Sequence, residues 1–174
     1  MNRRNFIIAV SSLAMITACK KEDNVSDAGE QLLVFSSITC SYCRTFHRDN
    51  SPYFAMTDRV KVIPYYRNMV DVASQMVIDA SGNRSEEVKN YLYENDDWLA
   101  GDNILANLNQ VVNRFDVKID LEKTVKDRNQ IDKMVRVLEE AVGFRHITGT
   151  PAFFIGERAL SWDEAVEFVE ELKP

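Results

Sequence analysis

The sequence contains only three cysteines and two histidines among its 174 residues. Three cysteines are too few for a small protein that is held together by several disulfides. No apolar stretch reaches the roughly 18–20 residues that a membrane-spanning helix needs. Positive charge is also scarce, because 21 basic residues face 27 acidic ones for a net charge of −6. Such a surface repels phosphate backbones, so the sequence predicts no binding to nucleic acid.

The first nineteen residues have the layout of an export signal. A basic start, a short apolar core and a small-residue end follow one another: Arg3-Arg4, residues 6–16 and Thr17-Ala18. This layout predicts a signal peptide at residues 1–19. A buried N-terminal helix is the alternative, but the polar stretch 20–29 follows the apolar core directly.

The end of this segment, Ile16-Thr17-Ala18-Cys19, resembles the lipobox of bacterial lipoproteins. In that family the cysteine becomes the lipidated N-terminus, so the resemblance implies a lipid on Cys19 and attachment to a membrane. Ordinary cleavage that leaves a free thiol is the alternative. Residues 2–7 are also similar to a twin-arginine export signal, although Asn2 replaces the usual Ser or Thr and no lysine follows. Both export routes therefore stay open.

The rest of the chain divides into a tether and one domain. Residues 20–30 are polar and charged and contain no aromatic residue, which predicts a flexible tether. Residues 31–174 are enough for one hydrophobic core, and the whole chain has the ordinary globular composition of 45% hydrophobic and 28% charged residues. The expected location is the periplasm or the cell envelope, where disulfides persist.

The domain is predicted to be α/β. Short apolar runs indicate strands, and Pro64 places the second strand at a sheet edge or a bulge. Apolar residues at spacings of three and four indicate helices. Ser85 is expected to cap one helix, and Ser161 with Glu164 forms a capping box for the last. The predicted order is βα, β, several helices and ββα, with strands at 31–36, 60–66, 152–155 and 158–160 and helices from Cys40 and at 69–80, 86–93, 104–115, 131–142 and 162–172.

The motif Cys40-Ser41-Tyr42-Cys43 carries the chemistry. At the start of a helix, Cys40 would face unpaired backbone N–H groups, which favour a thiolate and lower the cysteine pKa from about 8.5 to roughly 3.5–7. Cys43 is expected to lie within disulfide reach but deeper in the protein. A disulfide that closes so short a loop adds little stability and is suited to being made and broken.

Three other interpretations of this motif compete. The pair could form a static disulfide, although a disulfide that closes so short a loop stabilises the fold little. It could be half of a zinc site, but the sequence has no second CxxC and only His47 and His146, so no metal site is predicted. It could also be a chance match. The strand before the motif and the helix after it favour the redox interpretation.

A second feature is Gly149-Thr150-Pro151, which leads into the strand at 152–155. An X–Pro bond at such a position is a candidate cis peptide. The alternative is an ordinary trans proline at the strand entry.

Together, the CxxC motif and this proline resemble the DsbA-like branch of the thioredoxin superfamily. The resemblance covers nearly all of residues 31–174 and includes Tyr66-Arg67 and Asp97-Trp98. It implies a thioredoxin fold with a helical insertion at about residues 68–142, and Pro151 in the cis form beside the disulfide. It also implies that Thr150 lines the substrate groove, with Ser41 and Tyr42 supporting the active site, and that no cofactor is needed.

The sequence departs from this family at two positions. Many members carry a buried acidic residue six positions before the first cysteine, where this chain has Val34, and many strong oxidases have histidine where it has Tyr42. The Ser-Tyr pair is similar to that of exported isomerases, but a tether of about eleven residues cannot supply their dimerisation domain. A monomeric thiol-disulfide oxidoreductase is therefore expected. Its partners would be proteins with thiols or disulfides and a DsbB-like or DsbD-like membrane protein, with the direction of exchange undetermined.

Two other classes of function remain as alternatives. A copper-binding assembly or relay lipoprotein could use the CxxC with a third ligand, and His47 is the nearest histidine. We expect His47 to be a solvated helix residue, and His146 to lie on a surface loop or at the border of the groove. A non-catalytic peptide-binding lipoprotein is the third class, and it predicts that the bond between Cys40 and Cys43 never cycles.

Overall fold

The computed structural model describes residues 30–54 and 56–173. The predicted signal peptide and nearly all of the predicted tether lie outside the described residues. Four strands form one sheet in the order β2-β1-β3-β4: β1 (Leu32–Ser36), β2 (Val60–Pro64), β3 (Ala152–Ile155) and β4 (Arg158–Leu160). β1 is parallel to β2 and antiparallel to β3, which pairs antiparallel with β4. β2 lies at the edge of this sheet, as Pro64 predicts.

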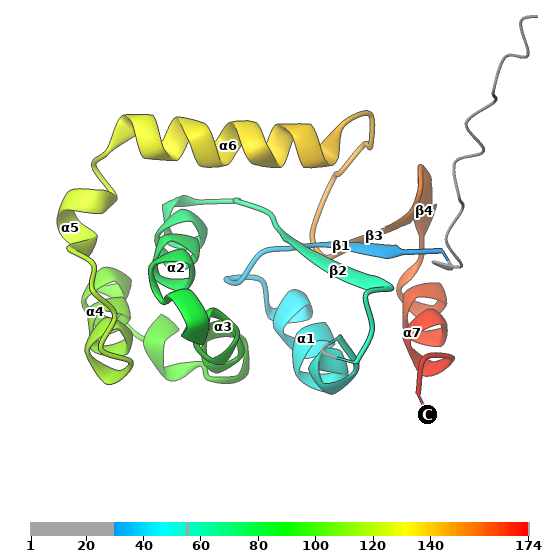
Figure 1. Ribbon diagram of the computed structural model, residues 1–174, viewed down its shortest axis with the longest axis horizontal. Helices are drawn as coiled ribbons and strands as arrows, with labels where there is room; N and C mark the ends of the chain where they lie inside the picture. The colour runs from blue at the N-terminus through cyan, green and yellow to red at the C-terminus, as the bar shows by residue number, and fades with distance from the viewer. Residues whose placement is uncertain (1–29, 55, 174) are drawn as a thin grey trace, which may run out of the picture.

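Helices cover both faces of the sheet (Figure 1). Between β2 and β3 the chain forms a helical insertion, so the predicted order of elements and the mixed α/β class are confirmed. The helices are α1 (Ser41–Phe54), α2 (Met69–Ala80), α3 (Ser85–Glu94), α4 (Ile104–Arg114), α5 (Leu121–Thr124), α6 (Arg128–Val142) and α7 (Trp162–Glu170), with 3-10 turns at Gly82–Arg84 and Asp97–Leu99.

Each face of the sheet has its own core. Leu32 and Val34 of β1 pack with Phe46 of α1 and Val169 of α7 on one face. On the other face, Phe35, Ile63 and Phe154 pack against half-buried residues of α6, including Leu138 and Val142. The continuous apolar run of β1 arises because this central strand is covered on both sides.

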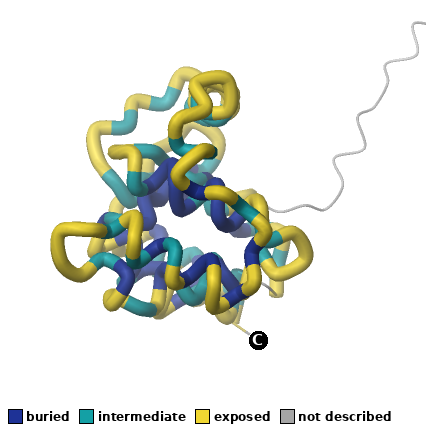
Figure 2. Tube along the Cα trace, turned by 90° about the vertical axis from the view of Figure 1, so that its left-hand side faces the viewer, coloured by how far each residue is buried: buried dark blue, intermediate teal, exposed yellow. Residues whose placement is uncertain are grey.

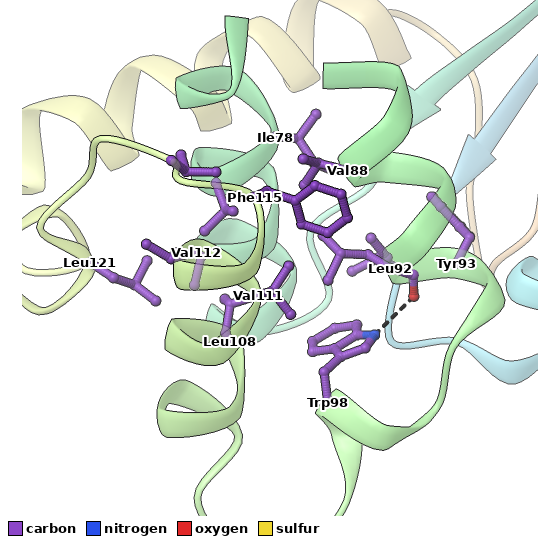
Figure 3. Close-up of a cluster of buried hydrophobic side chains, with 14 of the residues drawn as sticks. Ile78, Val88, Leu92, Tyr93, Trp98, Leu108, Val111, Val112, Phe115 and Leu121 are labelled. Atoms are coloured by element: carbon purple, nitrogen blue, oxygen red, sulfur yellow. Dashed lines mark hydrogen bonds between the residues drawn. The ribbon is translucent and has the colours of Figure 1, made fainter. Parts of the chain in front are cut away.

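A third cluster of buried side chains joins the insertion to the start of α1. Trp98 of the insertion donates its indole N–H to the carbonyl of Leu92 at 2.9 Å, and Leu108, Val111 and Phe115 surround this pair (Figure 3). Cys40 and Cys43 belong to the same cluster. The insertion therefore packs directly behind the cysteine motif.

Several helix ends differ from the predictions. Ser85 is the first residue of α3 rather than its cap, and Arg84 at the N-cap position makes no side-chain cap hydrogen bond. The capping box of Ser161 and Glu164 is present at the start of α7. The helix α6 carries the predicted apolar stripe, but none of its residues is fully buried. Figure 2 shows the fully buried residues gathered in the interior, with intermediate and exposed residues outside them.

Candidate active site

The two cysteines lie where β1 passes into α1. Cys40 directly precedes α1, and Cys43 falls in its first turn. The N–H of Cys40 donates to the carbonyl of Ser37 at 3.1 Å, and the carbonyl of Cys40 accepts from the N–H of Arg44 at 3.0 Å. The exposed fraction is 6% for Cys40 and 1% for Cys43, so Cys43 is the deeper thiol, as predicted. Both are free thiols in this structure.

The position of Cys40 at the helix start favours its thiolate. Burial acts to raise its pKa, but the backbone N–H groups of Cys43 and Tyr42 point toward the sulfur and lower it. The net effect is a pKa below that of an ordinary cysteine. This is the electrostatic effect expected for a sulfur in the N-cap position of a helix.

Cys43 has the opposite electrostatic environment. Burial raises the pKa of its thiol to about 12, although the N–H of Ser37 donates to the sulfur at 3.4 Å. Near neutral pH the two cysteines therefore take different roles. The thiolate is favoured at Cys40, whereas Cys43 keeps its proton.

The proline loop meets the motif from the other end of the chain. The antiparallel pairing of β1 with β3 brings the two together, and the thiol of Cys40 donates to the carbonyl of Thr150 at 3.2 Å. The Thr150–Pro151 peptide is cis, as the sequence predicts. Thr150 and Pro151 also line an open cleft of about 330 Å³, together with His146.

The remaining predicted site residues take different positions. Ser41 and Tyr42 are exposed at the start of α1, where Tyr42 has 69% of its surface in solvent. Both residues directly follow Cys40 in the sequence. Cys19 lies outside the described residues. Val34 is buried in β1, so no acidic side chain occupies that position.

The prediction for His47 is wrong. This residue is 2% exposed, because α1 packs its inner face against α3 of the insertion. Its ring stacks on Tyr93 with centroids 4.1 Å apart, and its Nε2 lies 3.0 Å from the side-chain oxygen of Asn90. Burial lowers the pKa of His47 to about 4. The neutral ring is therefore a packing element and not a solvated residue.

The sequence analysis missed Asp71, which is 3% exposed and lies in the first turn of α2. Its carboxylate accepts hydrogen bonds from the hydroxyl of Ser37 at 2.9 Å and from the N–H and hydroxyl of Thr39, both at 3.0 Å. The N–H of Arg67 donates to it at 2.8 Å. The signal in the sequence is an acidic residue inside the apolar stretch 69–78, but acidic residues are common in the first turn of any helix.

The part of the chain that the structure describes contains no cluster of three or more His, Cys, Asp or Glu residues that could hold a metal ion. None of the helices at residues 30–54 and 56–173 is long and apolar enough to cross a membrane.

Comparisons with known proteins agree with this geometry. A family described as thioredoxin matches residues 25–172. A protein-disulfide isomerase from Novosphingobium aromaticivorans superposes with a TM-score of 0.64 at 15% identity, over 86% of this chain and 95% of that one. For alpha-DsbA1 from Wolbachia pipientis the TM-score is 0.59 at 17% identity, over 82% and 84% of the two chains. For BdbD from Bacillus subtilis it is 0.55 at 16% identity, over 84% and 89%.

None of the curated proteins compared with the chain matches it significantly. The similar structures share too little sequence to indicate more than the fold, and in the fold they confirm the DsbA-like resemblance. The family match covers almost the whole chain. The chain therefore belongs to the thioredoxin family.

Proposed function

We propose that this protein is an exported thiol-disulfide oxidoreductase that exchanges disulfides with protein thiols through Cys40 and Cys43. The observation that carries the proposal is the contact between Cys40 Sγ and the Thr150 carbonyl at 3.2 Å. This contact supports the proposal because it brings the thiol with the lowered pKa together with the loop of Thr150 and Pro151. His47, the histidine that the copper alternative would use as a third ligand, is instead buried against Tyr93 and Asn90.

In the reducing direction, the Cys40 thiolate attacks a substrate disulfide and forms a mixed disulfide, and one substrate sulfur leaves as a thiol. Cys43 then loses its proton and attacks Cys40 Sγ. The Cys40–Cys43 disulfide forms, and the second substrate sulfur leaves and takes up a proton. Two electrons pass from the protein to the substrate. In the oxidising direction, the same steps run in reverse from the disulfide form.

Thr150 supports substrate binding in this proposal. An extended segment that enters the cleft beside Thr150 and Pro151 can pair with the backbone there, as an added strand does. Tyr42 is exposed at the rim and offers apolar contact. Ser41 and Tyr42 together tune the redox pair, because they occupy the turn between its two sulfurs.

Replacement of each cysteine tests the proposal. Cys40→Ser removes the nucleophile and should abolish the reduction of insulin disulfides, with a loss of at least about a hundredfold. Cys43→Ser leaves the nucleophile without its resolving thiol and should accumulate mixed disulfides with substrate. Turnover and trapped adducts can be measured in one assay. Wild-type turnover in both variants would contradict the proposal and favour a non-catalytic role.

We further propose that Cys19 carries lipid and that residues 20–30 hold the domain away from a membrane. The support is the lipobox-like sequence 16–19, and several acyl chains give stable attachment where one is marginal. Metabolic labelling with a fatty acid should mark the wild type and leave Cys19→Ser unlabelled. Unlabelled wild-type protein in the soluble fraction would reduce Cys19 to a residue of the signal peptide.

A further inference from the structure

Asp71 connects the helical insertion to the loop Ser37–Thr39, which directly precedes the cysteine motif. The carboxylate of Asp71 belongs to the insertion, and its oxygens accept hydrogen bonds from Ser37 and Thr39. These two residues lie between β1 and Cys40. Asp71 itself is held at the start of α2, where its N–H donates to the side chain of Asn68 at 3.0 Å. The side-chain amide of Asn68 also donates to the hydroxyl of Thr39 at 3.1 Å. The start of α2 and the loop therefore form one hydrogen-bond network.

This loop positions both sulfur atoms. The carbonyl of Ser37 accepts from the N–H of Cys40 at 3.1 Å, which sets Cys40 at the start of α1. The N–H of Ser37 donates to Cys43 Sγ at 3.4 Å. Ser37 therefore contacts both members of the pair through its backbone, while its side chain is held by Asp71.

A second helix of the insertion holds the same segment from behind. The hydroxyl of Tyr93 in α3 donates to the hydroxyl of Ser36 at 2.9 Å. Both residues are buried. The hydroxyls of Ser36, Ser37 and Thr39 thus all form hydrogen bonds with side chains of the insertion.

We propose that Asp71 is a positioning residue for the redox pair. It holds the Ser37–Thr39 loop so that Cys40 stays at the helix start and the Ser37 N–H stays on Cys43 Sγ. This inference rests on the proposed function and assigns to the insertion a role in tuning exchange at the cysteines.

The direction in which the pKa of Cys40 changes when the Asp71 carboxylate is removed separates this role from a purely electrostatic one. Loss of a negative charge near a thiol favours the thiolate and lowers its pKa. Loss of the loop geometry withdraws N–H groups from the sulfur and raises its pKa. A positioning residue therefore predicts a rise in the pKa of Cys40 when the carboxylate is removed.

Asp71→Asn tests this role, because asparagine has nearly the same shape but only one oxygen acceptor. In the folded reduced protein, the pKa of Cys40, followed by the pH dependence of its alkylation, should rise by about one unit. That corresponds to about a tenfold loss of thiolate below both pKa values. The control is Asp79→Asn on the same helix, where the carboxylate accepts from Gln75 and is exposed. It should leave the alkylation profile unchanged.

Thr39→Val is the second variant, and it covers the case in which Asp71→Asn does not fold. It removes the partner hydroxyl with little change of shape and should shift the Cys40 profile in the same direction. In the Asp71→Asn background its effect should shrink, because the two groups act through one contact.

A lowered or unchanged Cys40 pKa in a folded Asp71→Asn or Thr39→Val protein would overturn the inference. The equilibrium with glutathione, measured on the same samples, separates this outcome from failure of the proposed function. If the wild type itself does not exchange with glutathione, the proposed function fails. If the wild type exchanges and the variants keep its constant and its pH profile, only the role of Asp71 fails.

Discussion

At the scale of single residues, the two sulfurs of the motif differ in protonation although they are three positions apart. Cys40 has backbone N–H groups directed at its sulfur, and its pKa is lowered. Cys43 is buried, and its pKa is raised to about 12. Near pH 7 the Cys43 thiol therefore keeps its proton. In the proposed exchange reaction, this thiol therefore attacks only after a mixed disulfide has formed on Cys40.

This difference predicts selective alkylation of the reduced protein. Iodoacetamide near pH 7 should modify Cys40 and leave Cys43 unmodified, and peptide mapping by mass spectrometry can count the two sites separately. The unfolded chain serves as the control, because there both thiols are solvated and should react at similar rates. Equal labelling of Cys40 and Cys43 in the folded protein would contradict the assigned roles.

At the scale of elements, local patterns predict most of the fold. The apolar run of β1, the stripe of α2 and the capping box of α7 each depend on residues close in sequence, and all three elements form where they are expected. The predicted helix ends are less accurate. Ser85 is the first residue of α3 and not its cap, because a 3-10 turn leads directly into this helix. The candidate redox pair is found in the same way, since helix start and spacing are both local.

Contacts between distant elements could not be predicted in this way. The carboxylate of Asp71 and the hydroxyl of Thr39 are 32 positions apart, and only the packing of α2 beside the loop brings them together. The burial of His47 has the same origin. Its helix has polar residues on several sides, and only the docking of α3 determines which of them leave the solvent.

At the scale of the whole molecule, His47 lies where the sheet and its helices meet the insertion. It stacks on Tyr93 and contacts Asn90, and both belong to α3. Its Nδ1 has no hydrogen-bond partner within the part of the chain that the structure describes. A proton added to this ring would place a charge in the contact between the two parts of the protein. Burial is the main cause of its lowered pKa and outweighs the hydrogen bond with Asn90, which raises the pKa.

This contact predicts a specific loss of stability in acid. The pKa of His47 is about 4 in the folded protein against 6.5 for an ordinary histidine, so the unfolded chain takes up the proton first as the pH falls. Its contribution is complete above pH 6.5 and is lost progressively down to about pH 4, by up to about 3 kcal/mol. In urea titrations across this range, His47→Gln should lose less stability with falling pH than the wild type. His146→Gln, in an exposed loop, should follow the wild type. If the slopes of His47→Gln and the wild type coincide, the ring is already charged in the fold, and the contact with α3 tolerates that charge.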